Sequence, residues 1–292
     1  MPELILHPTT DAQTSQFMAN PAHAVLITGP DGIGKAALAG HMVAALLGIP
    51  DLASYPHFLR LTPDGTSISI DKIRELQKFL QLKTAGARPL RRAVIIEHAS
   101  ALTTEAQNAY LKLLEEPPAD TLMVLTASSP RALLPTILSR LQTITVHAPS
   151  AAQLQPLLQA SGKDETTLRQ AYFLSGGLPG LLTALISNSA DGEAHPLLGA
   201  VTTAKELLQK APFERLAYVE ALSKQKESAL AVLEALDRMA QASLGASAAK
   251  QDAARLKQWH TIRKNTLQAR QSLEKSANTK LTLSNLFLHL PG

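Results

Sequence analysis

The stretch from Gly29 to Ala36 combines glycine and lysine in a pattern that suits phosphate binding. It lies between an apolar run at 24–28 and a helical pattern at 37–47. Glycines let backbone N–H groups turn toward phosphate oxygens, the start of the next helix adds positive partial charge, and Lys35 neutralises β- and γ-phosphate charge. The sequence therefore predicts a phosphate-binding loop, with a glycine-rich turn that binds nothing as the alternative. Its nucleotide-binding residues would be Gly29, Pro30, Asp31, Gly32, Ile33, Gly34, Lys35 and Ala36.

Two positions that ATP hydrolysis requires carry unsuitable residues. Ala36 stands where the pattern asks for a Ser or Thr hydroxyl to hold Mg²⁺. Glu97-His98 follows an apolar run at the point where such ATPases carry an acidic pair for Mg²⁺ and the attacking water. Glu97 could reach a metal-bound water and joins the predicted nucleotide-binding residues, but His98 has no fixed negative charge at neutral pH. This pattern leaves ATP binding open, allows Mg²⁺ only with a nucleotide, and predicts no turnover. Polar residues that simply end a strand are the alternative.

Composition excludes several classes of protein. The chain has 292 residues, of which 45% are hydrophobic and 18% charged, so it can bury a core and is not mainly disordered. No apolar run approaches the roughly 18 residues of a membrane span, and the first residues do not resemble a signal peptide, so we expect a cytoplasmic protein. The absence of cysteine excludes disulfides, a thiol nucleophile and cysteine-based zinc sites, and the nine histidines have no ligand spacing. We expect no metal site and no zinc.

The elements that position these residues alternate in a way typical of parallel βαβ units. The predicted strands are 24–28, 58–62, 93–97, 122–126 and 143–146, with helices from about 71 and 104 between them. Thr104 and Gln107 have the spacing of a capping box. After residue 150 the sequence becomes helical throughout, with breaks at 175–180 and 188–193. The predicted domains are a doubly wound α/β domain at 1–148, a small helical domain at 149–192 and a larger one at 193–292.

Four motifs together resemble the AAA+ clamp-loader family of bacterial DNA polymerase III. They occur in the family's order, at Pro21–Ala24, Ile70–Leu76, Asn108–Pro118 and Leu134–Arg140. The third contains Leu-Lys-Leu-Leu-Glu-Glu-Pro-Pro and the fourth ends in Ser-Arg. The resemblance is strong over about 20–146 and fainter beyond, where 278–288 is similar to the family's last collar helix. It implies a phosphate-loop AAA+ domain, a helical lid and a collar that mediates oligomerisation.

The resemblance also implies roles for single residues. Arg140 matches the arginine that reaches into a neighbouring subunit's nucleotide site as a trans finger, although Leu141 replaces the cysteine that follows it in the family. The segment 176–181 matches the lid position where active members carry a phosphate-sensing arginine, and it has none. Hydroxyls at 126–129 match the sensor region, without indicating which one faces a phosphate. The cysteine zinc module of many members is absent.

The implied function is that of a non-hydrolysing scaffold subunit in DNA replication. Its partners would be other clamp-loader subunits, of the gamma/tau ATPase type and the delta type, in a hetero-oligomer of the polymerase III holoenzyme. It would meet the sliding clamp and primed DNA through that complex, and no membrane. The first alternative is an ATP-hydrolysing motor subunit with atypical motifs, in which Glu97 recruits Mg²⁺ alone. A nucleotide kinase is a second, which the Glu-Glu-Pro-Pro and Ser-Arg motifs disfavour.

Positive charge is concentrated near the end of the chain. Residues 250–280 carry eight basic and two acidic side chains, in a chain whose formal net charge is +4. Such a stretch could contact DNA, but a solvated helical face is the more usual case. Arg88, Arg91 and Arg92 form a second basic cluster, which has no aromatic side chains beside it for stacking bases.

Overall fold

The computed structural model describes residues 4–84, 86, 88–162, 165–186, 196–249, 251–275 and 277–291. These residues form two compact units. The first runs up to Leu154 and includes the short segment Leu178–Gly180, and the second comprises Gln155–Gly177 and the chain from Leu181 onward. The predicted boundary at 192 and the predicted break at 188–193 lie outside the described residues, so the division into three domains stays a prediction.

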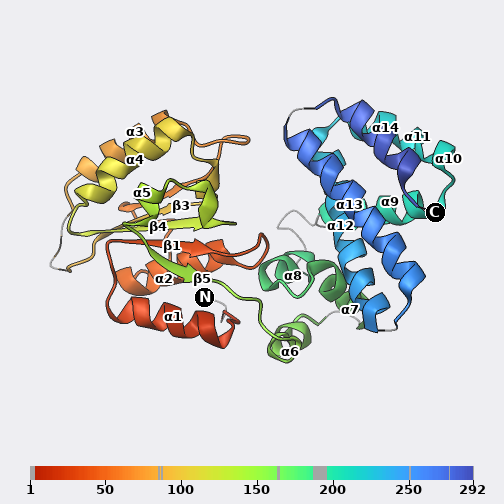
Figure 1. Ribbon diagram of the computed structural model, residues 1–292. Coiled ribbons are helices and arrows are strands. Elements are labelled where there is room, and N and C mark those ends of the chain that lie inside the picture. Colours follow the sequence, from red (N-terminus) through yellow and green to blue (C-terminus); the bar gives the residue numbers. More distant parts are fainter. Residues whose placement is uncertain are drawn as a thin grey trace. The chain divides into compact units, whose positions relative to one another are not determined.

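The first unit is built on a parallel sheet of five strands (Figure 1). In spatial order the strands are β2 (Phe58–Leu61), β3 (Arg92–Ile96), β4 (Thr121–Ala127), β1 (Ala24–Thr28) and β5 (Gln142–Thr145). The three central strands are buried along their whole length, as expected for strands covered on both faces. The α/β fold predicted from the sequence is confirmed, and each strand lies within one residue of its predicted limits.

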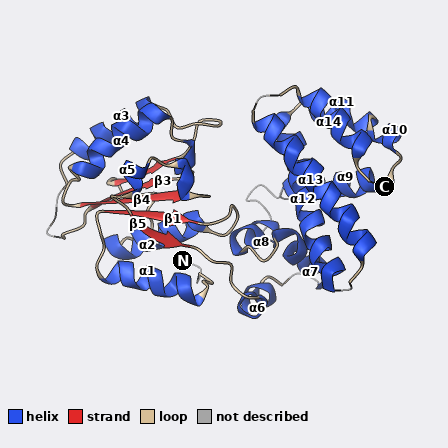
Figure 2. Ribbon diagram, in the orientation of Figure 1, coloured by secondary structure: helices blue, strands red, loops and turns tan. Residues whose placement is uncertain are grey.

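Helices cover both faces of this sheet (Figure 2). One face carries α1 (Pro8–Ala19) and α2 (Lys35–Leu47), and the other carries α3 (Ile70–Gln81), α4 (Thr104–Glu115) and α5 (Pro135–Leu138). Short 3₁₀ turns lie at Ala99–Ala101 and Pro130–Ala132. Successive residues of β1 point to opposite faces, so Val25 packs with α2 while Leu26 packs with α3 and α4. The helix α1 was not predicted, because its buried residues include Thr10 and Thr14 rather than an apolar stripe.

Side chains of α1 protect the exposed edge of the sheet. The Thr10 hydroxyl donates to the Thr145 carbonyl (3.2 Å) and accepts from the His147 N–H (2.9 Å). The Gln13 side-chain oxygen accepts from the Thr145 N–H (3.0 Å). An edge strand with unpaired backbone groups is a template for aggregation. These bonds satisfy the backbone at the carboxyl end of β5 without a further strand.

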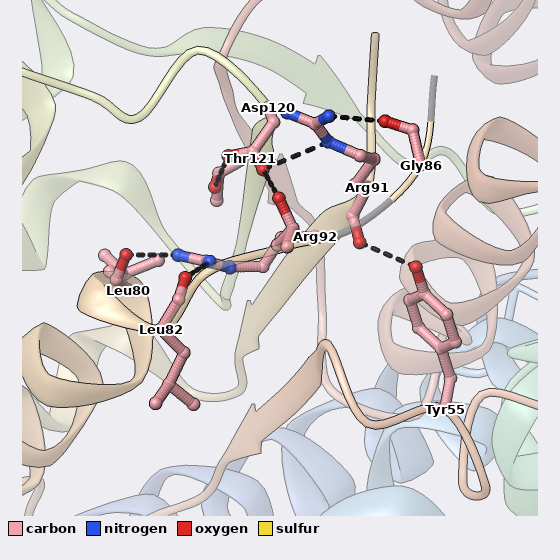
Figure 3. A network of polar contacts seen from close by, with 9 residues as sticks. Tyr55, Leu80, Leu82, Gly86, Arg91, Arg92, Asp120 and Thr121 are labelled. Carbon is pink, nitrogen blue, oxygen red and sulfur yellow. Dashed lines mark hydrogen bonds and ion pairs between the residues drawn. The ribbon is translucent and has the colours of Figure 1, made fainter. Parts of the chain in front are cut away.

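Arginines at the amino end of β3 stabilise the fold locally (Figure 3). Arg92 is 2% exposed, donates to the carbonyls of Leu80 and Leu82, and lies over the Phe79 ring. Arg91 donates to the Gly86 carbonyl (2.7 Å) and forms an ion pair with Asp120 (3.4 Å). Another cluster member, Arg88, donates to the Leu47 carbonyl. These guanidinium groups bind carbonyls of their own unit, which explains the cluster without a nucleic-acid partner.

The second unit is all helical. Its helices, of which α6 and α8 begin in the first unit, are α6 (Ala151–Ala160), α7 (Glu165–Ser175), α8 (Pro179–Ile186), α9 (Pro196–Gln209), α10 (Pro212–Arg215), α11 (Ala217–Ser223), α12 (Lys226–Ala249), α13 (Ala253–Glu274) and α14 (Thr279–His289). Along α13, Ile262, Ala269 and Leu273 are buried at a heptad-like spacing. Arg215 is fully buried and donates to the Phe287 and Leu290 carbonyls at the end of α14. None of the helices in the described ranges is long and apolar enough to cross a membrane.

Candidate functional site

The predicted phosphate-binding loop connects β1 to α2 in the first unit. Gly29 begins it with φ +153°, and an added Cβ there would lie 2.9 Å from the Val146 carbonyl oxygen. Gly34 ends it with φ +100° and caps α2. Ile33 between them is 3% exposed and packs into the core beneath the loop. The strand, loop and helix therefore have the arrangement that the sequence predicts.

The amino group of Lys35 is fully engaged by its own loop. Its Nζ donates to the Gly29 carbonyl (2.7 Å), the Pro30 carbonyl (3.0 Å) and the Asp31 carboxylate (3.0 Å). Lysine has three N–H donors, and all three are used. Lys35 is 7% exposed. A phosphate would have to displace these contacts to reach the charge, and Ala36 beside it offers no hydroxyl for Mg²⁺.

A segment far away in the sequence lies directly against the loop. Leu178–Gly180 belongs to the first unit, and Leu178 packs on the cluster that contains Ile33. A Cβ on Gly180 would lie 2.9 Å from both the Gly32 carbonyl oxygen and the Gly34 nitrogen. Any group bound at the Gly34 amide must share this space with Gly180. The sequence showed that the segment lacks an arginine, but gave no signal for this contact. The residues present fit a bound nucleotide poorly.

Glu97 follows the carboxyl end of β3 and has a partner of its own. Its carboxylate is 3.2 Å from the Arg60 guanidinium on β2, an ion pair that the sequence analysis did not predict. β4 separates β3 from β1, so Glu97 is two strands away from the strand that leads into the loop. The next residue, His98, has a left-handed backbone (φ 50°) and donates its N–H to the Thr126 hydroxyl (3.1 Å). Of the sensor-region hydroxyls, Thr126 is therefore the one that contacts the Glu97-His98 turn.

Arg140 lies at the opposite end of the sheet from the loop. The loop follows the carboxyl end of β1, whereas Arg140 comes two residues before the amino end of β5, and the two strands are parallel neighbours. Its side chain is 37% exposed, and its guanidinium donates from Nη1 to the Thr136 carbonyl (2.9 Å) and pairs through Nη2 with Glu115 (3.1 Å). Arg140 thus cannot serve the loop of its own chain. Glu115 lies in the motif at Asn108–Pro118, and the sequence pattern did not predict its pairing with Arg140.

The basic stretch near the end of the chain is partly neutralised within its own unit. Arg255 pairs with Asp252 (3.5 Å) and Arg263 pairs with Asp237 (3.0 Å). Lys257 lines a groove of about 580 Å³ beside α13. Lys250 lies outside the described residues. Contact of this stretch with DNA stays a prediction.

A family model matches most of the first unit. Residues 9–150 match the family model described as DNA polymerase III, delta subunit. The DNA polymerase III subunit delta′ of Pseudomonas aeruginosa is 36% identical over 197 residues, which are 60% of this chain and 59% of that protein. The delta′ subunit of Bacillus subtilis is 40% identical over a match that covers 31% of this chain and 27% of that protein. The delta′ subunit of Escherichia coli is 31% identical over a match that covers 45% of this chain and 40% of that protein.

This chain therefore matches about three fifths of the Pseudomonas relative's length and smaller parts of the others. Among solved structures, a DNA polymerase III gamma subunit-related protein from Thermotoga maritima has 19% identity and a TM-score of 0.55, covering 96% of this chain and 97% of its own. That likeness shows a shared fold. The chain is similar to delta′ subunits of DNA polymerase III, and the clamp-loader resemblance drawn from its motifs is confirmed.

Proposed function

We propose that this chain is a clamp-loader subunit of DNA replication that does not hydrolyse ATP and that supplies Arg140 to the nucleotide site of a neighbouring ATPase subunit. Its similarity to delta′ subunits supports the clamp-loader role. The ATPase neighbour would be of the gamma/tau type, within a cytoplasmic hetero-oligomer that includes a delta-type subunit and meets the sliding clamp and primed DNA. The helical second unit would provide the contacts of assembly.

The observation that carries the non-hydrolysing role is that groups of the chain itself fill the phosphate-type loop. Lys35 donates its three N–H groups to oxygens of the loop, and Gly180 lies close to the backbone of Gly32 and Gly34. Ala36 removes the hydroxyl that would hold Mg²⁺. These features act on different parts of a bound nucleotide: its phosphate charge, the space it needs, and its metal. Their coincidence favours a scaffold over a motor.

The position of Arg140 supports action in trans. It is exposed, and it lies at the sheet end opposite to its own loop. A guanidinium can donate charge-assisted hydrogen bonds to a γ-phosphate and stabilise the charge that develops during phosphoryl transfer. It needs no nucleotide on its own chain. This function therefore does not depend on the loop that Lys35 and Gly180 occupy.

The test is ATP binding and hydrolysis by the purified chain with Mg²⁺. We expect no phosphate release above background, and we expect Lys35→Ala to behave like the wild type in this assay. Ala36→Ser restores the missing hydroxyl, and we expect it to remain inactive because Lys35 and Gly180 still occupy the loop. Magnesium-dependent turnover that Lys35→Ala abolishes would instead support the motor alternative.

The trans role is tested in a loader reconstituted with the cognate subunits. We expect Arg140→Ala to assemble normally and to slow hydrolysis at the adjacent site by on the order of 10³-fold, the low end for arginine fingers. Arg131→Ala is the matched control, because Arg131 is another exposed arginine in the connection between β4 and β5. Equal rates for the two variants would remove Arg140 from the mechanism.

A further inference from the structure

The partner of Arg140 occupies an electrostatically unfavourable position on its own helix. Glu115 is the last residue of α4, and its Oε1 lies 3.1 Å from Arg140 Nη2. The carboxyl end of a helix carries negative partial charge, which disfavours an acidic side chain there. The next residue, Glu116, is acidic as well. Glu115 therefore does not stabilise α4 by its charge, and its favourable contact is the one with Arg140.

Contacts within the chain orient the Arg140 guanidinium and leave some of its N–H donors available to a ligand. Nη1 donates to the Thr136 carbonyl (2.9 Å) and lies 3.4 Å from the Ser139 hydroxyl, and Nη2 donates to Glu115. Arginine has five N–H donors in a planar fork. The described contacts leave the Nε hydrogen and one Nη2 hydrogen for an incoming anion. Glu115 can thus orient Arg140 without consuming its capacity to bind phosphate.

The same helix also fixes the backbone that carries Arg140. Gln107 on α4 is 6% exposed, and its amide donates to the Ala132 carbonyl (3.3 Å) and accepts from the Leu134 N–H (2.8 Å). The capping-box role suggested for Gln107 is wrong, because Thr103 caps α4 instead. Gln107 anchors the start of the α5 segment from the buried side. Glu115 engages the end of that segment from the surface.

We infer that Glu115 is a positioning residue for Arg140, which holds the guanidinium in the orientation needed at the neighbouring subunit's nucleotide site. The inference rests on the proposed function, in which Arg140 acts in trans. A guanidinium already ordered loses less side-chain entropy when it reaches the phosphate. Because the ion pair is 37% and 46% exposed, it is a modest one.

The experiment measures steady-state ATPase of the reconstituted loader with Glu115→Gln in this chain. We expect kcat to fall about two- to fivefold, the range for a partly exposed ion pair, with KM for ATP unchanged because Arg140 acts on the charge that develops in the transition state. Glu116→Gln is the matched control, since it removes the same charge one residue away, and we expect wild-type kcat. In the Arg140→Ala background, Glu115→Gln should have no further effect, because Glu115 acts only through Arg140.

The outcomes separate this inference from the proposed function. If Arg140→Ala slows the loader but Glu115→Gln matches Glu116→Gln, the positioning role is overturned and the trans arginine stands. If Glu115→Gln raises kcat, or still lowers it in the Arg140→Ala background, the positioning role is also overturned. If Arg140→Ala has no effect, both ideas are overturned together. Equal melting temperatures of the variants would show that a lower kcat does not come from unfolding.

Discussion

The conformation of the phosphate-type loop depends on glycine at position 29. Its φ of +153° and its contact with the Val146 carbonyl leave no room for a side chain. The loop is then completed by bonds from Lys35 to its own carbonyls. The Lys35 amino group therefore stabilises the loop itself.

At this scale, we expect Gly29→Ala to destabilise the first unit by about 2 kcal/mol, because the new methyl group would meet the Val146 carbonyl at 2.9 Å in a strained backbone. Urea unfolding followed by circular dichroism measures this change. Gly40→Ala is the matched control within α2, where a Cβ finds ordinary contacts. We expect it to be neutral or to stabilise by up to about 1 kcal/mol. Equal effects of the two substitutions would contradict the steric argument.

At the scale of elements, the amino ends of β3 and β4 are joined by charged groups. Asp120 precedes β4, accepts hydrogen bonds from the Thr84 and Thr121 hydroxyls, and pairs with Arg91. Burial raises the pKa of Asp120, but these hydrogen bonds and the charges of Arg92 and Arg91 outweigh it, so the pKa lies below its ordinary value. The ionised carboxylate thus ties the loop before β3 to the sheet.

This lowered pKa predicts a pH dependence of stability. A carboxyl group that is more acidic in the folded state contributes stability above its unfolded pKa of about 4, and the contribution is lost as pH falls through the folded value. We expect Asp120→Asn to cost about 2 kcal/mol at pH 7 and progressively less below about pH 4. Denaturant unfolding across this pH range measures it. Asp71→Asn, in an exposed pair with Arg74, should change little at any pH, and a pH-independent cost for Asp120→Asn would refute the assignment.

At the scale of the whole molecule, neither unit is one continuous stretch of the sequence. Leu178–Gly180 packs in the first unit, while the residues on both sides of it belong to the second. Gly180 has no side chain, and this is what allows its backbone to approach Gly32 and Gly34. The approach of Gly180 to the loop therefore depends on the tertiary fold and is not encoded in the loop sequence.

We expect Gly180→Ala to displace this segment, because its methyl group would collide with the Gly32 and Gly34 backbone at 2.9 Å. Local opening should then speed hydrogen exchange of the loop amides by about tenfold, as a cost near 1.4 kcal/mol implies. Mass spectrometry of peptides covering residues 29–36 measures this. Gly199→Ala, where an added Cβ meets nothing within 4 Å, should leave the exchange of these amides unchanged. Unchanged exchange in Gly180→Ala would mean that the segment does not protect the loop.

The sequence by itself determined the parallel α/β unit, the phosphate-type loop and the family resemblance, because buried strands, glycine turns and the motif around Arg140 are local patterns. It also showed that Ala36 lacks a metal-binding hydroxyl. Only the tertiary structure placed Gly180 on the loop, paired Glu97 with Arg60, and set Arg140 beside Glu115 at the far end of the sheet. These contacts join residues that are distant in the chain, and neither residue type nor spacing encodes them. They arise only when the helices pack over the two faces of the sheet.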